Sequence, residues 1–381
     1  MKRTYVFKLY RSKKNKKLHR LIEIASSVYN HLLALQKCFY RFYKSYIPLY
    51  RLQKHLTKLK QFQRFCHWNQ LGSQALQEIA ERIDKGYKRF FDALRKKREW
   101  KVCPPRFKPA RKYKSFTLKQ AGYKLFEDHC IRIGKEKYKF FKSRTIQGEI
   151  KTLTIKRDSL GDIYLCFSCE VKNEKVQESM TGKNAGFDFG LITFCTSSDE
   201  EKIESPLFFK RQQKALKHAH RKVSSKQKGS NQRKKAHLVV ARLHRKVFRQ
   251  RRAFHFEQAR LLISRYDALF FEDLNLNAMK KRYGRKINDL GFHSFLQIVK
   301  NYAEQRGKIV HLIDRFEPTS KTCSSCGHAI KDLDLKVRSW CCEVCCTEHD
   351  RDINAAKNIF RVGTSTLRLG DVRPNKLAIA V

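Results

Sequence analysis

Six cysteines cluster near the carboxyl end of the sequence, and four of them have the spacing of a metal site. One pair encloses two residues, fifteen residues follow, and a second pair again encloses two residues. This is the spacing of a zinc ribbon, in which two tight turns each present a pair of thiolates to one tetrahedral ion. The predicted ligands of this structural zinc are Cys323, Cys326, Cys342 and Cys345.

The extra cysteines leave one choice open. Cys341 and Cys346 flank the second pair, so either could replace a ligand, although only the C-x2-C pair repeats the spacing of the first. The seven other cysteines are scattered, and we expect them to be free thiols buried as small hydrophobic side chains. We expect no disulfides, because no secretory signal is recognisable and paired CxxC motifs outside secreted proteins indicate metal.

Three acidic residues, far apart in sequence, could do hydrolytic chemistry together. Asp188 is expected near the end of a strand, Glu272 ends the apolar run 266–271, and Asp352 follows the ribbon where an Ala-rich helix begins. Carboxylates suit Mg²⁺ or Mn²⁺. Singly, such residues more often face water; together they fit a two-ion site that activates water against a phosphodiester. Clustered carboxylates raise each other's pKa and need cations to stay ionised.

The charge balance points to a polyanionic partner. The chain has 84 Lys and Arg against 35 Asp and Glu, a formal net charge of +49. No acidic residue occurs between Ser205 and Phe256. Because so large a surplus repels itself, we expect nucleic acid to neutralise it. The aromatic residues are not gathered on one amphipathic stripe, which disfavours a membrane surface.

The elements that must position these residues differ between the two halves of the chain. Residues 2–9 alternate like a strand, and apolar residues at helical spacing predict helices from about Lys17 to Arg98. Strand-like segments follow at 115–118 and 130–133, and a hairpin turns near Gly161. A small β-barrel interrupted by a helical insertion would explain strands on both sides of the helices.

The second half alternates strands with helices, as in an α/β core. A strand ending near Asp188, a tight glycine turn and a strand from Leu191 to Cys195 come first. Basic helices over 205–256, the strand ending at Glu272 and a helix over 293–306 follow. Gly307 is expected to end that helix before the strand 308–313 and the ribbon.

At these residues the chain resembles the TnpB (OrfB) family, RNA-guided DNA endonucleases encoded by insertion sequences and related to the type V CRISPR nucleases. The resemblance lies in FDFG around Asp188, FEDLN around Glu272, PTSKTCSSCGH over 318–328 and RSWCCEVCCTEHDRDINAAKNI over 338–359. One departure is visible, because Cys346 stands where a glycine commonly follows the second pair of cysteines.

The resemblance implies the fold and the site. It implies an α/β, RNase H-like RuvC nuclease domain with an inserted zinc ribbon, preceded by a wedge-type β-barrel that a helical recognition lobe interrupts. The implied ranges are 1–10 and 101–182 for the barrel, 11–100 for the lobe, 183–381 for the nuclease domain, 205–256 for its basic helical segment and 318–349 for its ribbon. The implied catalytic acids and Mg²⁺ (or Mn²⁺) ligands are Asp188, Glu272 and Asp352, with Asp350 as a neighbour.

The function that the resemblance implies is cleavage of double-stranded target DNA beside a short flanking motif, after pairing with a guide RNA. The resemblance implies a monomeric ribonucleoprotein, nucleoid-associated in a bacterium or archaeon. A cytoplasmic protein is expected, since no apolar run reaches membrane-spanning length. Two alternatives stay open: a non-cleaving RNA-guided DNA-binding repressor, which would be expected to have lost an acid, and a transposase that joins DNA strands itself.

Overall fold

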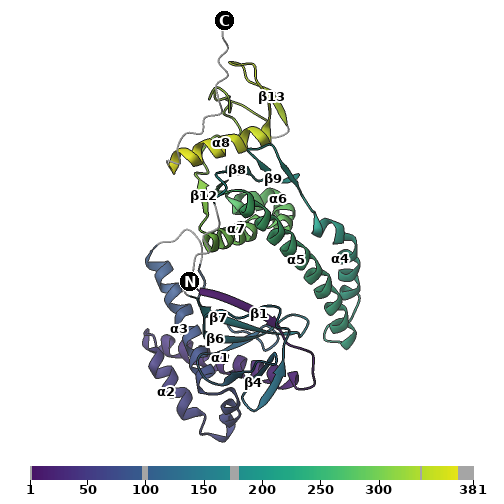
Figure 1. Ribbon diagram of the computed structural model, residues 1–381. Helices are drawn as coiled ribbons and strands as arrows, with labels where there is room; N and C mark the ends of the chain where they lie inside the picture. The colour runs from purple at the N-terminus through teal and green to yellow at the C-terminus, as the bar shows by residue number, and fades with distance from the viewer. Residues whose placement is uncertain (1, 97–101, 172–179, 335–336, 368–381) are drawn as a thin grey trace. The chain divides into compact units, whose positions relative to one another are not determined.

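The computed structural model describes residues 2–96, 102–171, 180–334 and 337–367 (Figure 1). The chain divides into two compact units, Met1–Asn173 and Glu174–Val381, each with its own hydrophobic core. No helix within the described ranges is long and apolar enough to cross a membrane.

The helices of the amino-terminal unit form one layer of its core. They are α1 (Asn15–Tyr43), α2 (Leu49–Leu59), the 3-10 helix η1 (Gln63–Leu71) and α3 (Ser73–Arg95). Apolar residues at helical spacing line one face of α1, among them Leu18, Ile22 and Ala25, and this face packs against α3. Charged residues occupy the opposite faces, as expected for surface helices.

The strands of this unit form two small sheets. They are β1 (Lys2–Lys8), β2 (Ser115–Leu118), β3 (Tyr123–Leu125), β4 (Cys130–Ile133), β5 (Glu136–Lys139), β6 (Glu149–Arg157) and β7 (Ile163–Glu170). The sheet orders are β1-β7-β6-β2 and β3-β4-β5, and all of these pairs are antiparallel. Since β1 pairs along its whole length with β7, the helices are inserted between two partner strands. Closure of these sheets into a barrel stays a prediction.

The carboxy-terminal unit is built on a five-stranded mixed sheet of order β10-β9-β8-β11-β12. Its strands are β8 (Asn184–Asp188), β9 (Thr193–Ser197), β10 (Lys202–Glu204), β11 (Ala268–Glu272) and β12 (Ile309–Ile313). Strands β8, β11 and β12 are parallel, and β9 and β10 are antiparallel to their neighbours. The expected mixed α/β architecture is confirmed.

Helices cover both faces of this sheet. The helices of this unit are α4 (Phe208–Ser224), α5 (Asn231–Arg265), α6 (Leu276–Leu290), α7 (Phe292–Arg306) and α8 (Arg351–Thr366). Phe271 packs with residues of α5 and α7, whereas its neighbour Phe270 packs against Ile359 of α8. Side chains alternate across a strand, so two consecutive phenylalanines serve the two layers. Figure 1 shows α7 and α8 on opposite sides of the strands.

A close approach of α8 to the sheet requires glycine on β8. A Cβ atom on Gly186 would lie 2.4 Å from the backbone oxygen of Ala356 and the backbone nitrogen of Phe360. Gly186 therefore lets α8 rest directly on the strand that ends at Asp188.

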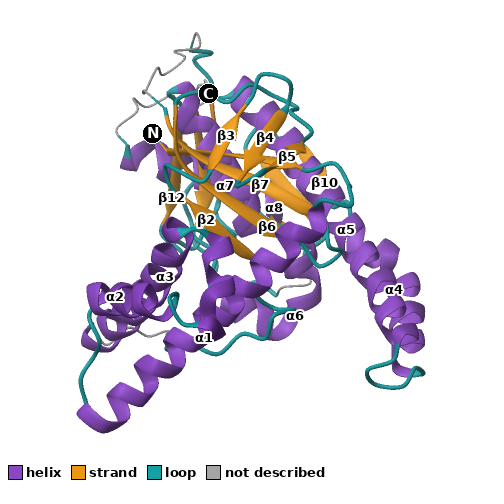
Figure 2. Ribbon diagram, turned by 90° about the horizontal axis from the view of Figure 1, so that it is seen from below, coloured by secondary structure: helices purple, strands orange, loops and turns teal. Residues whose placement is uncertain are grey.

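Helices α4 and α5 form a basic hairpin. They run side by side away from the sheet (Figure 2) and pack through Ala219, Val223 and Val240. Ser230 caps α5, because its side chain accepts the N–H of Arg233.

One boundary and one helix differ from the sequence-based expectation. Strand β9 begins at Thr193, whereas a strand from Leu191 was expected; Leu191 and the exposed Ile192 belong to the turn after Gly190. Helix α6 was not expected at all, because its sequence is mostly polar. Gly307 ends α7 in the left-handed conformation (φ 70°), as expected.

Candidate active site and metal centre

Two of the three candidate acids lie at the same edge of the sheet. Asp188 is the last residue of β8 and Glu272 the last of β11, and these strands are parallel neighbours with Phe187 opposite Phe271. The carboxyl ends of parallel strands meet at one edge, so the two carboxylates are adjacent. Both residues are half-buried.

The third acid reaches this edge from a helix. Asp352 is in the first turn of α8, which lies on β8 through Gly186. Burial, and after it the negative charges of Glu272 and Asp352, raise the pKa of Asp188 to about 7. Burial and then the charge of Asp273 raise the pKa of Glu272. The structure thus brings together three carboxylates that are 84 and 80 residues apart in sequence.

Cations beside the acids offset only part of this repulsion. The guanidinium of Arg351 and the backbone N–H of Phe189 act against the rise in the pKa of Asp188. Arg338 lies 3.5 Å from a carboxylate oxygen of Asp352. The sequence analysis missed both arginines, although Arg351 stands within the DRD segment and Arg338 four residues before the second C-x2-C pair.

Asp350 supports the helix and is not one of the three clustered acids. Its carboxylate accepts the backbone N–H groups of Asp352 and Ile353 and pairs with Lys202 at 2.7 Å. This cap fixes the first turn of α8 and therefore the position of Asp352. The pKa of Asp350 is lowered despite its burial, mainly by the hydrogen bond from Lys202.

The four cysteines of the predicted ribbon converge on one point. Their sulfur atoms all lie within 4.8 Å of one another. The Sγ atoms of Cys323 and Cys345, and those of Cys326 and Cys342, are 3.6 Å apart. A disulfide would require about 2.05 Å, whereas sulfurs on a tetrahedral zinc at 2.3 Å lie roughly 3.8 Å apart. The cluster therefore fits a zinc ribbon.

The surroundings of the cluster add a residue that spacing did not identify. Nε2 of the buried His349 lies 3.0 Å from Sγ of Cys323, in contact distance for a hydrogen bond that orients a ligand. Hydrogen bonds from Thr347 lower the pKa of Cys345 to about 6. Cys341 and Cys346 are exposed and lie outside this group of four.

The seven scattered cysteines only partly match their expected burial. Cys169 and Cys195 are buried, but Cys38, Cys66 and Cys103 are exposed, so the expectation of buried thiols was wrong for these three. They lie on or beside helices whose apolar faces are filled by larger side chains.

Two asparagines connect the ribbon to the helix of Asp352. The side-chain amides of Asn354 and Asn358 both donate to the backbone oxygens of Thr319 and Thr322, and Asn354 also accepts the backbone N–H of Ser324. Both residues are 1% exposed. The loop that enters the ribbon is thereby bonded to α8 within two turns of Asp352.

Positive charge is concentrated on the hairpin of α4 and α5. Exposed cations recur along α5, at Lys234, Lys235, Arg242, Lys246, Arg249 and Arg252. Helical spacing spreads them around the helix, which gives a long surface for a phosphate backbone.

Comparisons with known proteins find similar sequences over most of the chain. Residues 166–283 match the family model OrfB_IS605, described as "Probable transposase", and residues 292–359 match the Cas12f1-like TNB domain. The "Putative RNA-guided DNA endonuclease" of Streptomyces pristinaespiralis is 29% identical over 84% of this chain and 79% of its own. The "Putative RNA-guided DNA endonuclease InsQ" of Escherichia coli is 25% identical over 91% of this chain and 88% of its own.

Among solved structures, the mini-RNA-guided endonuclease CRISPR-Cas phi3 aligns over 95% of this chain and 92% of its own. The identity of that alignment is 12% and the TM-score 0.46.

Proposed function

We propose that the chain is a member of the TnpB (OrfB) family and an RNA-guided DNA endonuclease of an insertion sequence. The observation that supports this most is the convergence of Asp188, Glu272 and Asp352 at one edge of the sheet. We assign these three residues as the catalytic acids. In this proposal the sheet and its helices are an RNase H-like RuvC nuclease domain, covering 183–381.

In this proposal the three acids bind divalent cations. Their mutual repulsion and burial raise the pKa of Asp188 to about 7, so the cluster is short of positive charge. Oxygen donors of this kind suit Mg²⁺ or Mn²⁺. When bound, such ions activate water and stabilise negative charge on the leaving oxygen of a phosphodiester.

The chain itself prepares the site in three ways. Strands β8 and β11 fix two carboxylates, and the cap by Asp350 fixes the third. The stacked rings of Phe187, Phe189 and Phe271 form an apolar layer behind the acids and exclude water from that side. Arg351 and Arg338 place positive charge beside the carboxylates, where a scissile phosphate would also be attracted.

The four cysteines fit Zn²⁺ in a structural role. Four thiolates complete a tetrahedral sphere and leave no position for substrate. The bonds of Asn354 and Asn358 then connect the zinc-stabilised loop to α8. In this proposal zinc contributes to catalysis only by holding Asp352.

The partners proposed for this chain are a guide RNA and double-stranded target DNA with a short flanking motif. The net charge of +49 and the basic hairpin α4–α5 support a polyanionic partner. In this proposal base pairing with the guide RNA selects the target. The protein recognises the flanking motif and the shape of the heteroduplex. The strands of the amino-terminal unit would form the wedge barrel (1–10 and 101–182), and its helices the recognition lobe (11–100).

Substitution of the acids tests the proposal. Asp188→Ala and Glu272→Ala should each lower target cleavage more than about a hundredfold, because each removes a metal ligand. Binding of the co-purifying RNA should be unchanged. Glu204→Ala, which removes an exposed acid from β10 of the same sheet, is the matched control and should cut normally. Undiminished cleavage by Asp188→Ala in Mg²⁺ would refute the assignment.

The same preparations separate the alternatives. A transposase would join DNA strands without RNA, and a repressor would bind its target without cutting it. Metal analysis should find about one zinc per chain, and Cys326→Ala should lose that zinc together with cleavage. Active protein free of zinc would contradict the structural role of the ribbon.

A further inference from the structure

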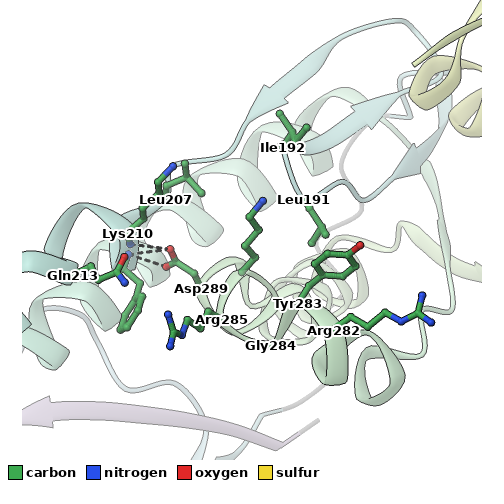
Figure 3. A pocket seen from close by; sticks show the side chains of 12 residues that line it. Leu191, Ile192, Leu207, Lys210, Gln213, Arg282, Tyr283, Gly284, Arg285 and Asp289 are labelled. Atoms are coloured by element: carbon green, nitrogen blue, oxygen red, sulfur yellow. Dashed lines mark hydrogen bonds between the residues drawn. The ribbon is translucent and has the colours of Figure 1, made fainter. Parts of the chain in front are cut away.

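A basic pocket on the carboxy-terminal unit is lined in part by the turn that follows Asp188. It has a volume of about 590 Å³ and is formed by the turn after β8, the start of α4 and the kink of α6 (Figure 3). Pockets of roughly 300–1,000 Å³ hold small organic molecules, a range that includes a nucleotide.

The lining is strongly positive. Four exposed cationic side chains surround the pocket, namely Lys210, Arg282, Arg285 and Lys286. Among the residues that the structure describes, none of the four forms an ion pair. They are therefore available to an anionic ligand.

The acid in the lining does not cancel this charge. Asp289 is buried, and its carboxylate accepts the backbone N–H groups of Phe209 and Lys210 at 2.9 to 3.3 Å. Figure 3 shows these bonds at the start of α4. Asp289 thus caps a helix whose preceding residue, Leu207, has a left-handed backbone (φ 44°), and so holds α4 against α6.

An exposed aromatic ring stands among the cations. Tyr283 is 44% exposed and has non-helical dihedrals (φ −121°, ψ 28°), which kink α6 immediately before Gly284. Figure 3 shows its ring below Leu191. An exposed ring between arginines offers a face on which a base can stack while phosphates pair with the guanidinium groups.

Two residues that line the pocket lie close to Asp188 in the sequence. Leu191 and Ile192 line it and follow Asp188 by three and four residues. Ile192 is 64% exposed, although it is a large apolar side chain. A ligand seated here therefore contacts the turn that leads directly out of the strand bearing Asp188.

We propose that this pocket binds one or two nucleotides of single-stranded DNA beside the scissile phosphate, with a base stacked on Tyr283 and phosphates paired with Arg282 and Arg285. The inference rests on the proposed nuclease function and adds a substrate-positioning site to it. A strand anchored here has its next phosphates near Asp188 and Glu272, since the same short turn joins the two sites.

Single-turnover cleavage by the purified ribonucleoprotein tests the stacking contact. Tyr283→Ala should slow cleavage of a guide-matched target about tenfold or more, in the range expected for loss of one stacked base. Tyr283→Phe keeps the ring and should cut at nearly the wild-type rate. RNA content and target binding of both variants should match the wild type.

The cationic contact is tested by a matched pair of variants. Arg282→Gln/Arg285→Gln should slow cleavage and flatten its salt dependence, whereas Arg282→Lys/Arg285→Lys, which keeps the charge, should retain most of the rate. Wild-type rates in both the Ala and the Gln variants would overturn the pocket while leaving the nuclease intact. No cleavage by the wild type would instead contradict the proposed function.

A readout independent of cleavage uses target DNA with 5-iodouracil near the cut site, irradiated in EDTA. A crosslink to the peptide that contains Tyr283 supports the assignment. Crosslinks confined to other peptides, or obtained only when the guide RNA carries the label, would overturn it. This measurement also decides the matter if Tyr283→Ala fails to fold.

Discussion

At the scale of single residues, the decisive property is the unfavourable charge at Asp188. A carboxyl group whose ordinary pKa is about 3.9 has a pKa of about 7 here, because it is buried beside Glu272 and Asp352. The folded state then binds a proton more tightly than the unfolded chain. Stability is therefore lost as pH rises from about 4 to 7, by at most about 4 kcal/mol from this group.

This gives a prediction for Asp188→Asn, which removes the charge and keeps the shape. Without divalent metal, the variant should be more stable than the wild type at pH 8, and the difference should shrink towards pH 4. Mg²⁺ should raise the melting temperature of the wild type more at pH 8 than at pH 6, because protons compete with the ion, and should hardly affect the variant. Thermal denaturation across this pH range measures both effects.

This prediction is contradicted if Asp188→Asn, without divalent metal, is less stable than the wild type at pH 8. Asp273→Asn is a suitable control, since Asp273 pairs with Arg315 next to Glu272 and has a cation to compensate it. Its removal should not stabilise the protein.

Residue types and spacing predicted much of the site, but only what is local in sequence. The sequence predicted the C-x2-C pairs from their spacing. It predicted the acids from their place at the ends of apolar runs, because a buried strand ends where charged residues follow. The contact of His349 with Cys323, and the bonds of Asn354 and Asn358 to Thr319 and Thr322, could not. These contacts depend on how α8 folds back on the ribbon loop, which no local pattern specifies.

At the scale of elements, the position of α8 decides whether the three acids meet. The helix lies on β8 only because Gly186 has no side chain. Strand periodicity predicted β8 and β11 as separate strands, but their adjacency is a non-local pairing across the inserted hairpin α4–α5. Helix α6 was not predicted because it has few apolar residues. Its kink at Tyr283 also interrupts the helical spacing of those residues.

Gly186→Ala tests the role of this close approach. The added methyl would meet backbone atoms of Ala356 and Phe360 at 2.4 Å, so α8 must move. We expect a loss of roughly 1–3 kcal/mol in the free energy of unfolding and a loss of cleavage larger than that destabilisation explains. Denaturant unfolding and cleavage assays of Gly186→Ala beside the wild type measure both losses. Equal stability and equal cleavage would contradict the packing argument.

At the scale of the whole molecule, the net charge of +49 must be balanced by its partner. The affinity for RNA should fall steeply with salt, with a log–log slope of about −0.7 for each phosphate contact on a single strand. Replacing Lys235, Arg242, Lys246 and Arg249 of α5 with Gln should reduce the slope by about 3 if all four contact phosphates. Exchanging Lys and Arg at the same positions keeps the charge and should leave the slope unchanged. An unchanged slope in the Gln variant would mean that these four residues of α5 do not contact the phosphates of the RNA.

The central claim is that an RNA directs DNA cleavage at one carboxylate site. The most direct measurement is reprogramming: the target-pairing segment of the co-purifying RNA is replaced, and plasmids carrying the old or the new target are incubated with the complex in Mg²⁺. We predict that the cut moves to the new target, and that Asp188→Ala complexes with the same RNA bind it without cutting. Cleavage that stays at the old sequence, or that proceeds without RNA, would contradict the account.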